Sequence, residues 1–234
     1  MNKLEIREIN VLSAGAVQPG LVKVIDAFRK VSSHPVKITF ATAPIILSRI
    51  GAADGLDAVI APPAVLEEWT KAGKASVADC VTVGRIGVGV VVRDGTSQPK
   101  IATVDEFKQS LISAESLVYN QASTGIYLEK LFERLAIAEQ LKTKTVRYPD
   151  AAAVLDHISK GKGCEIGLGA TTVIIDGQNK GLKFVGALPA EIQNYTAYTA
   201  TVVTAPTASD AAREFIRFLK EPVAKDALAA AGIQ

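Results

Sequence analysis

Short segments rich in β-branched residues alternate with amphipathic segments almost without interruption along this chain, and this alternation restricts its fold more than any other feature. Strands that alternate with helices predict a parallel sheet with helices on its faces. The first strands and helices are expected, in chain order, over 11–12, 19–28, 36–40, 44–51, 56–60 and 65–72. Two of these helices begin at a proline, Pro19 and Pro44, which suits the first turn of a helix.

A second α/β series follows in the later part of the chain. Thr103 is expected to cap its first helix, with Glu106 at the capping-box position, and Asp150 is expected to cap a later helix. The strands and helices of this series are expected over 104–111, 116–119, 126–135, 145–148, 151–158, 165–168 and 183–185, and two C-terminal helices over 209–219 and 223–231.

Two long β-branched segments, 81–93 and 195–204, join the two series. We therefore expect an α/β protein of two lobes with a discontinuous chain. Lobe one comprises 1–82 and 199–234, and lobe two comprises 83–198. Open α/β sheets bind ligands outside the carboxyl ends of their strands, so a ligand cleft is expected between the lobes.

Composition excludes several classes of function. Of the 234 residues, 48% are hydrophobic and 21% charged, which is enough to form a core, and the net charge of +2 argues against nucleic acid as a partner. No apolar run approaches the roughly 20 residues of a membrane span. The glycines of 84–89 run in the order GxxGxG within a strand pattern, so they indicate a bent strand and not a dinucleotide site. No P-loop is present.

Neither cysteines nor histidines form a recognisable site. Cys80 and Cys164 are expected to be buried free thiols, and His34 and His157 fit no metal-binding pattern, so no metal and no cofactor are predicted. A Ser/His/Asp or Cys/His catalytic set is not recognisable either. His157, in the middle of a helix, is expected to have a surface or packing role.

The N-terminus has alternating charged and apolar residues instead of the apolar run of a secretory leader. This alternation over 3–9 predicts a strand. The expectation is a cytoplasmic protein as encoded, or a periplasmic one if a leader was removed before Met1.

Hydroxyl-bearing and small residues follow strands at three strand-to-helix junctions. These are 13–16, 41–43 and 120–125, the last of which precedes a helix expected to begin at Ile126. A helix N-terminus presents unpaired N–H groups and positive potential, and serine and threonine hydroxyls add donors without charge. The three segments together could hold a small anion without lysine or arginine. The alternative is that each hydroxyl is an ordinary helix cap.

The chain also resembles a known family. The segments VLSAGAVQPGLVKVIDAFRK, ITFATAPIILSRI, LDAVIAPPAVLEEW, STGIYLEKLFERL and NYTAYTATVV are similar to the molybdate-binding-protein-like branch of the periplasmic solute-binding proteins. The resemblance covers nearly the whole chain. It implies a two-lobed, type II binding protein that closes about a hinge and captures an oxyanion or a small organic acid for an ABC-type importer. It also implies a monomer whose partners are the anion and an ABC permease.

The resemblance implies particular ligand-binding residues. Ser13 with Ala14, and Thr42 with Ala43, match the residues after the first two strands that contact the anion in this family. In lobe two the corresponding helix start comprises Ser123, Thr124 and Gly125. A tyrosine near the return crossing completes the family's set, and either Tyr195 or Tyr198 would match it.

Two other functions stay open. Aconitate isomerase resembles this branch, so the chain could be a carboxylate isomerase with a proton-transfer group added to the anion site. Candidate groups are Tyr148, His157, Tyr195 and Tyr198. A cytoplasmic ligand sensor is the other possibility, although no DNA-binding helix-turn-helix precedes the first strand.

Overall fold

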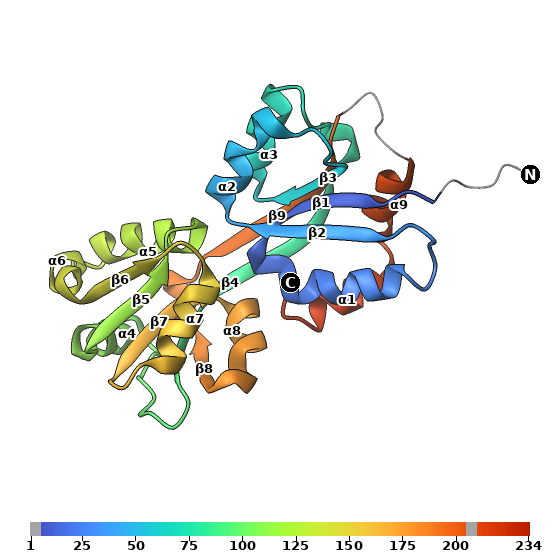
Figure 1. The fold of residues 1–234 in the computed structure, drawn as a ribbon. Helices are drawn as coiled ribbons and strands as arrows, with labels where there is room; N and C mark the ends of the chain where they lie inside the picture. The colour runs from blue at the N-terminus through green and yellow to red at the C-terminus, as the bar shows by residue number, and fades with distance from the viewer. Residues whose placement is uncertain (1–5, 205–209) are drawn as a thin grey trace, which may run out of the picture. The chain divides into compact units, whose positions relative to one another are not determined.

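The computed structural model describes residues 6–204 and 210–234. The chain divides into two compact units. Unit 1 comprises Met1–Arg85 together with Ala197–Gln234, and unit 2 comprises Ile86–Thr196. The mixed α/β architecture (Figure 1) agrees with the fold class predicted from the alternating pattern.

Unit 1 contains a sheet in which three strands run parallel. The strand order is β2-β1-β3-β9, and β9 pairs with β3 in the antiparallel sense. Its elements are β1 (Ile9–Ala14), α1 (Gln18–Phe28), β2 (Val36–Ala41), α2 (Ala43–Ser48), β3 (Ala58–Ala61), α3 (Pro63–Lys71), the start of β4 (Val81–Arg93), most of β9 (Tyr195–Val202), α9 (Asp210–Phe218) and α10 (Pro222–Ala229).

Unit 2 contains a second sheet with the order β4-β7-β5-β6, and β8 also pairs with β4. β5 is parallel to both β6 and β7, whereas β4 is antiparallel to β7. Its further elements are α4 (Val104–Ser113), β5 (Ser116–Asn120), α5 (Ser123–Arg134), α6 (Ala138–Leu141), β6 (Thr145–Tyr148), α7 (Ala151–Lys160), β7 (Glu165–Ala170), α8 (Thr171–Gly177) and β8 (Leu182–Ala187). In Figure 1, α7 lies across the sheet.

Each unit has a buried apolar core. In unit 1 the ring of Phe28 lies 5.2 Å from both Phe215 and Phe218 in edge-to-face geometry, so α1 and α9 are joined through aromatic contacts. In unit 2, α4 and α5 contribute Phe107 and Leu128, neither of which is exposed to solvent, to a core that covers one face of the sheet. In α1 and α5 the apolar residues that recur at helical spacing are buried, among them Leu21 and Leu131.

The long segment predicted over 81–93 is one strand, β4. Gly84 has a φ of +145°, and a Cβ atom there would lie 2.5 Å from Ile233 Cγ2. The C-terminal residue pairs with the strand beside this glycine, because Arg85 N donates to Gln234 O at 2.7 Å and Gln234 N donates to Arg85 O at 3.0 Å. Glycine is therefore needed at position 84 for backbone conformation and for close packing, not for a nucleotide.

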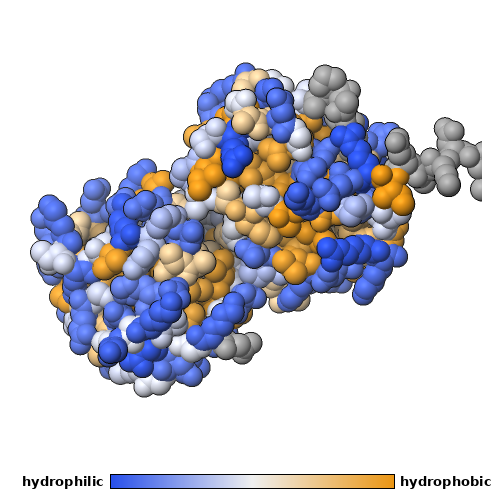
Figure 2. Space-filling view, in the orientation of Figure 1, coloured by the Kyte–Doolittle hydropathy of each residue, from blue (hydrophilic) through white to orange (hydrophobic). Residues whose placement is uncertain are grey.

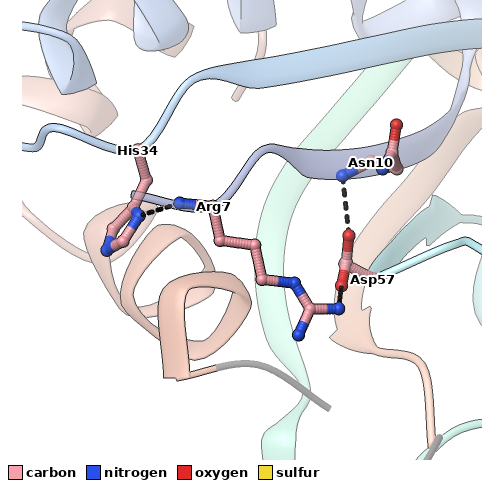
Figure 3. Close-up of polar contacts among 4 residues, drawn as sticks. All are labelled: Arg7, Asn10, His34 and Asp57. Atoms are coloured by element: carbon pink, nitrogen blue, oxygen red, sulfur yellow. Dashed lines mark hydrogen bonds and ion pairs between the residues drawn. The ribbon is translucent and has the colours of Figure 1, made fainter. Parts of the chain in front are cut away.

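A polar network holds the start of β1 at the amino ends of the parallel strands (Figure 3). The carboxylate of Asp57 accepts hydrogen bonds from Arg7 Nη2 at 3.1 Å and Asn10 N at 2.9 Å, and Arg7 N donates to His34 Nδ1 at 3.2 Å. The predicted strand over 3–9 is wrong at positions 6–8, which are not in a strand, and 1–5 lie outside the described residues. Side-chain contacts, not strand pairing, hold Arg7.

The elements differ from the sequence predictions mainly at their ends. The helix expected from Ile126 begins three residues earlier, at Ser123, and α6 and α8 were not expected. Both of these helices are short, with 4 and 7 residues, so they contain too few turns to show a helical period.

Figure 2 shows hydrophobic side chains exposed among hydrophilic ones on the viewed face of the molecule. Exposed apolar residues include Ile45 and Leu47 of α2 and Ile126 of α5. Within the described residues, no helix is both long enough and apolar enough to cross a membrane.

Candidate anion-binding site

In unit 1, the parallel register places the ends of β1, β2 and β3 at one edge of the sheet. Ser13 pairs with Phe40 of β2 and Ile60 of β3, and Ala14 pairs with Ala41. The chain then turns into a short 3-10 helix, Gly15–Val17, which leads into α1. The segments predicted from the sequence to follow the first two strands therefore lie at the same edge.

Ser13 is fully buried within β1. Its hydroxyl donates to the carbonyl oxygen of Ala14 at 3.3 Å, which is a long hydrogen bond. A serine hydroxyl can rotate, so this donor could turn to a better acceptor at the strand end. Ala14 is buried too, and its small side chain adds little bulk beside the backbone.

Thr42 is the N-cap residue of α2, in an extended conformation, yet its hydroxyl makes no capping hydrogen bond. Thr42 and Ala43 are both half-buried. Pro44 follows in the first turn and has no N–H to be capped. The threonine hydroxyl therefore lies beside a helix start without satisfying that helix.

Tyr198 lies at this same edge of unit 1. In the β3–β9 register Ala61 pairs with Thr199, and Tyr198 is the next residue of β9. Only 5% of Tyr198 is exposed, and burial raises the pKa of its phenol from 10.0 to about 12. At neutral pH its hydroxyl is therefore protonated and can act as a hydrogen-bond donor.

In unit 2, the register aligns the ends of β5, β6 and β7. Asn120 pairs with Tyr148, and Tyr119 pairs with Leu168. Ser123, Thr124 and Gly125 form the first turn of α5, which starts at this edge. The N-cap residue, Ala122, offers no side-chain hydrogen bond, so the first N–H groups of α5 have no cap.

Tyr195, the other candidate tyrosine, belongs to unit 2 and is 43% exposed. A Cβ atom on Gly87 would lie 3.2 Å from its ring. Since Val88 pairs with Ala170 at the end of β7, Tyr195 lies near the carboxyl end of that strand. The two tyrosines thus belong to different units.

Two threonines at this edge of unit 2 were not predicted from the sequence. β7 extends to Ala170, and Thr171 and Thr172 begin α8 behind an N-cap that makes no side-chain hydrogen bond. Thr172 is buried and Thr171 is half-buried. The signal was the sequence GATT after a strand, but the strand was predicted to end two residues too early.

Two helix starts of unit 2 show what a capping residue looks like in this protein. Thr103 Oγ1 accepts from Glu106 N at 3.2 Å, and Asp150 Oδ1 accepts from Ala153 N at 2.9 Å, which confirms both predicted caps. The carboxylate of Glu106 accepts from Ala102 N at 3.0 Å. By contrast, Thr42 is the N-cap residue of α2 and makes no such bond, and in α5 the N-cap residue is Ala122, so that Ser123 and Thr124 lie after the cap position.

His157, for which no partner was found in the sequence, lies between two polar side chains. Its Nδ1 lies 2.8 Å from the hydroxyl of Tyr148, and its Nε2 lies 3.3 Å from Oε1 of Glu165. The hydroxyl of Tyr148 is thus directed to α7. This network joins α7 to β6 and β7 across the sheet face, so neither residue is grouped with the strand-end hydroxyls.

The expectation of two buried thiols is wrong. Cys164 is exposed and Cys80 is half-buried, although both are free. Cys164 lies in the short connection between α7 and β7, where the backbone runs at the surface. Among residues 6–204 and 210–234, no group of three or more histidine, cysteine, aspartate or glutamate side chains is arranged to hold a metal ion.

Comparisons with known proteins agree with the resemblance seen in the sequence. Aconitate isomerase of Pseudomonas sp. is 26% identical over 237 residues, which cover 98% of this chain and 88% of that protein. The periplasmic molybdate-binding protein of Azotobacter vinelandii has a similar structure, with a TM-score of 0.77 and 19% identity, covering 97% of this chain and 98% of the other.

The sulfate-binding protein SubI of Mycobacterium tuberculosis H37Rv also shares the fold, with a TM-score of 0.74, 19% identity, and coverage of 97% of this chain and 86% of the other. The type II periplasmic-binding-protein fold predicted from the sequence is thereby confirmed. The family model described as bacterial extracellular solute-binding protein matches residues 9–234. Because this match spans nearly the whole sequence, the chain belongs to the bacterial extracellular solute-binding protein family.

Proposed function

We propose that this protein binds a small anion, either an oxyanion or a small organic acid, through hydroxyl and amide donors at the carboxyl ends of its strands. The donors in unit 1 are Ser13, Thr42 and Tyr198, with Ala14 and Ala43 providing room beside the backbone. In unit 2 they are Ser123, Thr124 and the N–H of Gly125, with Tyr195 near the end of β7.

The observation that carries this proposal is that, in the described part of the chain, the N-cap Thr42 of α2 makes no capping bond and the N-cap Ala122 of α5 has no hydroxyl with which to make one. Residues at a helix start favour serine and threonine because these hydroxyls satisfy backbone N–H groups. Here the hydroxyl of Thr42 is present at the N-cap but does not perform that task. Helix N-termini attract negative charge, so an anion is the ligand that such a donor set fits best.

Two kinds of relative support an anion as the ligand class. The similar solved structures include a molybdate-binding and a sulfate-binding protein. The relative found by sequence similarity is aconitate isomerase. The segments 13–16, 41–43 and 120–125 contain no lysine or arginine. Neutral donors suit an anion that must be released again, because each hydrogen bond adds only a modest amount to the binding free energy.

A thermal-shift screen tests this proposal. Molybdate and sulfate are compared with cis-aconitate, trans-aconitate and citrate, since a ligand that binds only the folded protein raises its melting temperature. Calorimetry then measures the affinity of any anion that stabilises the protein. Ser13→Ala and Thr42→Ala should each weaken binding by about 1–3 kcal/mol, because each removes a hydrogen bond to a charged group. Unchanged affinity in both variants would remove unit 1 from the site.

We further propose that the bound anion is delivered to an ABC-type importer. Deletion of the gene should reduce uptake of the anion found in the screen, and wild-type protein should restore uptake whereas a Ser13→Ala/Thr42→Ala double variant should not. Cell fractionation tests whether the protein reaches the compartment from which such an importer takes its substrate. Uptake that is unaffected by the deletion would contradict the transport role.

A carboxylate isomerase is the second candidate, and the aligned aconitate isomerase is the observation in its favour. An isomerase must add and remove a proton at carbon. Tyr198 is protonated at neutral pH and could supply a proton, although its raised pKa makes it a weak acid, and the protonated phenol could not act as the base. NMR of cis- or trans-aconitate incubated with the protein separates the two functions. Conversion that is lost in Tyr198→Phe, with binding retained, would establish catalysis, whereas binding without conversion would favour the transport role.

A further inference from the structure

Asn120 is a buried polar residue at the carboxyl end of β5, directly before the first turn of α5. Only 6% of the residue is exposed. Its side-chain oxygen, Oδ1, accepts a hydrogen bond from Ala122 N at 3.0 Å. Because an N–H group needs an oxygen as its acceptor, this contact fixes which end of the amide is oxygen and which is nitrogen.

The other end of this amide has no acceptor. Within residues 6–204 and 210–234, Nδ2 of Asn120 donates no hydrogen bond. Among the described residues, Nδ2 of Asn120 is not one of the fully buried side-chain atoms that lack a partner, so it is accessible from the protein surface and available to a ligand. The amide is held by Ala122, the N-cap residue of α5, so its free N–H₂ group lies at the start of this helix.

The first turn of α5 is packed against Asn120. A Cβ atom on Gly125 would lie 1.7 Å from Asn120 O, so only glycine allows this approach. α5 has 12 residues, and its first backbone hydrogen bond along the chain runs from Ile126 N to Ala122 O. The N–H groups of Ser123, Thr124 and Gly125 therefore have no partner within the helix and lie beside the amide of Asn120.

We propose that Asn120 is a further ligand-binding residue, whose Nδ2 donates a hydrogen bond to the anion bound at the start of α5. This inference rests on the proposed function. The ligand atom bound there is a negatively charged oxygen. The amide nitrogen of Asn120 donates a hydrogen bond to it, and the N-terminus of α5 adds N–H donors and positive potential. The ligand would accept a hydrogen bond from a donor that no described protein group uses.

Asn120→Asp is the most direct test. Aspartate has nearly the same shape and keeps an oxygen for Ala122 N, but it replaces the donor with a negatively charged acceptor that repels an anion. Gln109→Glu, in α4 of the same unit, is the control, because it adds the same charge on an exposed side chain outside the segment proposed to bind the anion. Calorimetry measures the affinities of both variants and of the wild type for molybdate, sulfate, cis-aconitate and citrate.

Asn120→Asp should weaken binding of whichever of these anions the wild type binds by roughly ten- to hundredfold, and Gln109→Glu by less than about threefold. Equal effects of the two substitutions, or unchanged affinity of Asn120→Asp, would overturn the role of Asn120 while leaving the proposed function standing. If the wild type bound none of the anions, the proposed function would fail and this inference with it.

Circular dichroism and the melting temperature show whether Asn120→Asp folds. If it does not, Asn120→Ser replaces it, since a serine oxygen can still accept from a nearby backbone N–H but has no amide nitrogen. A folded Asn120→Ser that binds as tightly as the wild type would also refute the proposal.

Discussion

Gly125 lies so close to Asn120 that a Cβ atom on the glycine would stand 1.7 Å from the asparagine carbonyl oxygen. The first turn of α5 can therefore approach the end of β5 only without a side chain at position 125. The two nearest atoms belong to the backbone of Asn120, which cannot move aside as the tip of a flexible side chain could.

Gly125→Ala should lower the free energy of unfolding by about 2–3 kcal/mol, because the strand end and the helix must separate to accept the methyl group. Chemical denaturation provides the measurement. Gly169→Ala is a control in the same unit, since a Cβ atom there would meet only Ile174, at 3.7 Å, and should cost about 1 kcal/mol or less. Equal losses in the two variants would contradict the close approach.

Substitution by alanine should change the free energy of unfolding differently at Thr103 and at Thr42. Thr103 caps α4 through a bond to Glu106 N, so Thr103→Ala should lower the free energy of unfolding by about 1 kcal/mol. Thr42 makes no capping bond, and Thr42→Ala should cost less than about 0.5 kcal/mol while weakening anion binding. Denaturation curves with and without the anion separate the two effects. A Thr42 variant as unstable as the Thr103 variant would show that Thr42 is an ordinary cap.

Tyr198 should make the protein sensitive to alkaline pH. Burial raises the pKa of its phenol from 10.0 to about 12, so folding favours the neutral phenol. The stability that this group contributes is complete below pH 10 and is lost as the pH rises through about 12. The slope from one group is at most about 1.4 kcal/mol per pH unit.

Tyr198→Phe should therefore show a smaller loss of stability than the wild type between neutral pH and pH 11–12, in denaturation curves measured across that range. The absorbance of tyrosinate gives a second measurement, because the variant should lack the tyrosine that ionises at about pH 12. Identical alkaline profiles for the two proteins would mean that Tyr198 is accessible to water.

The bond between Tyr148 and His157 is expected to be structural. Tyr148→Phe removes a hydroxyl that lies 2.8 Å from Nδ1 of His157 and should lower the free energy of unfolding by about 1 kcal/mol. Anion affinity should be unchanged, because this hydroxyl is directed to α7 and not to the start of α5. Calorimetry and denaturation on the same variant test both statements, and a loss of affinity without a loss of stability would place Tyr148 in the binding site.

Local patterns allowed much of the fold to be predicted. The extent of β4 and the caps Thr103 and Asp150 follow from residues a few positions apart, whose interactions form within one strand or one turn. The family resemblance likewise depends only on short sequence segments that occur in the expected order along the chain. The alternation of strands and helices alone determined the α/β class.

Tertiary structure decided which polar side chains form hydrogen bonds within the protein and which have donors left for a ligand. The partners of His157 are 9 and 8 residues away, and Tyr198 reaches the edge of β3 only through pairing of strands far apart in sequence. No spacing rule shows that the Thr42 hydroxyl makes no capping bond to α2, or that the side-chain nitrogen of Asn120 has no hydrogen-bond partner among the described residues. Those properties depend on packing between distant segments, because hydrogen bonding and burial are set by whichever groups the folded chain brings near.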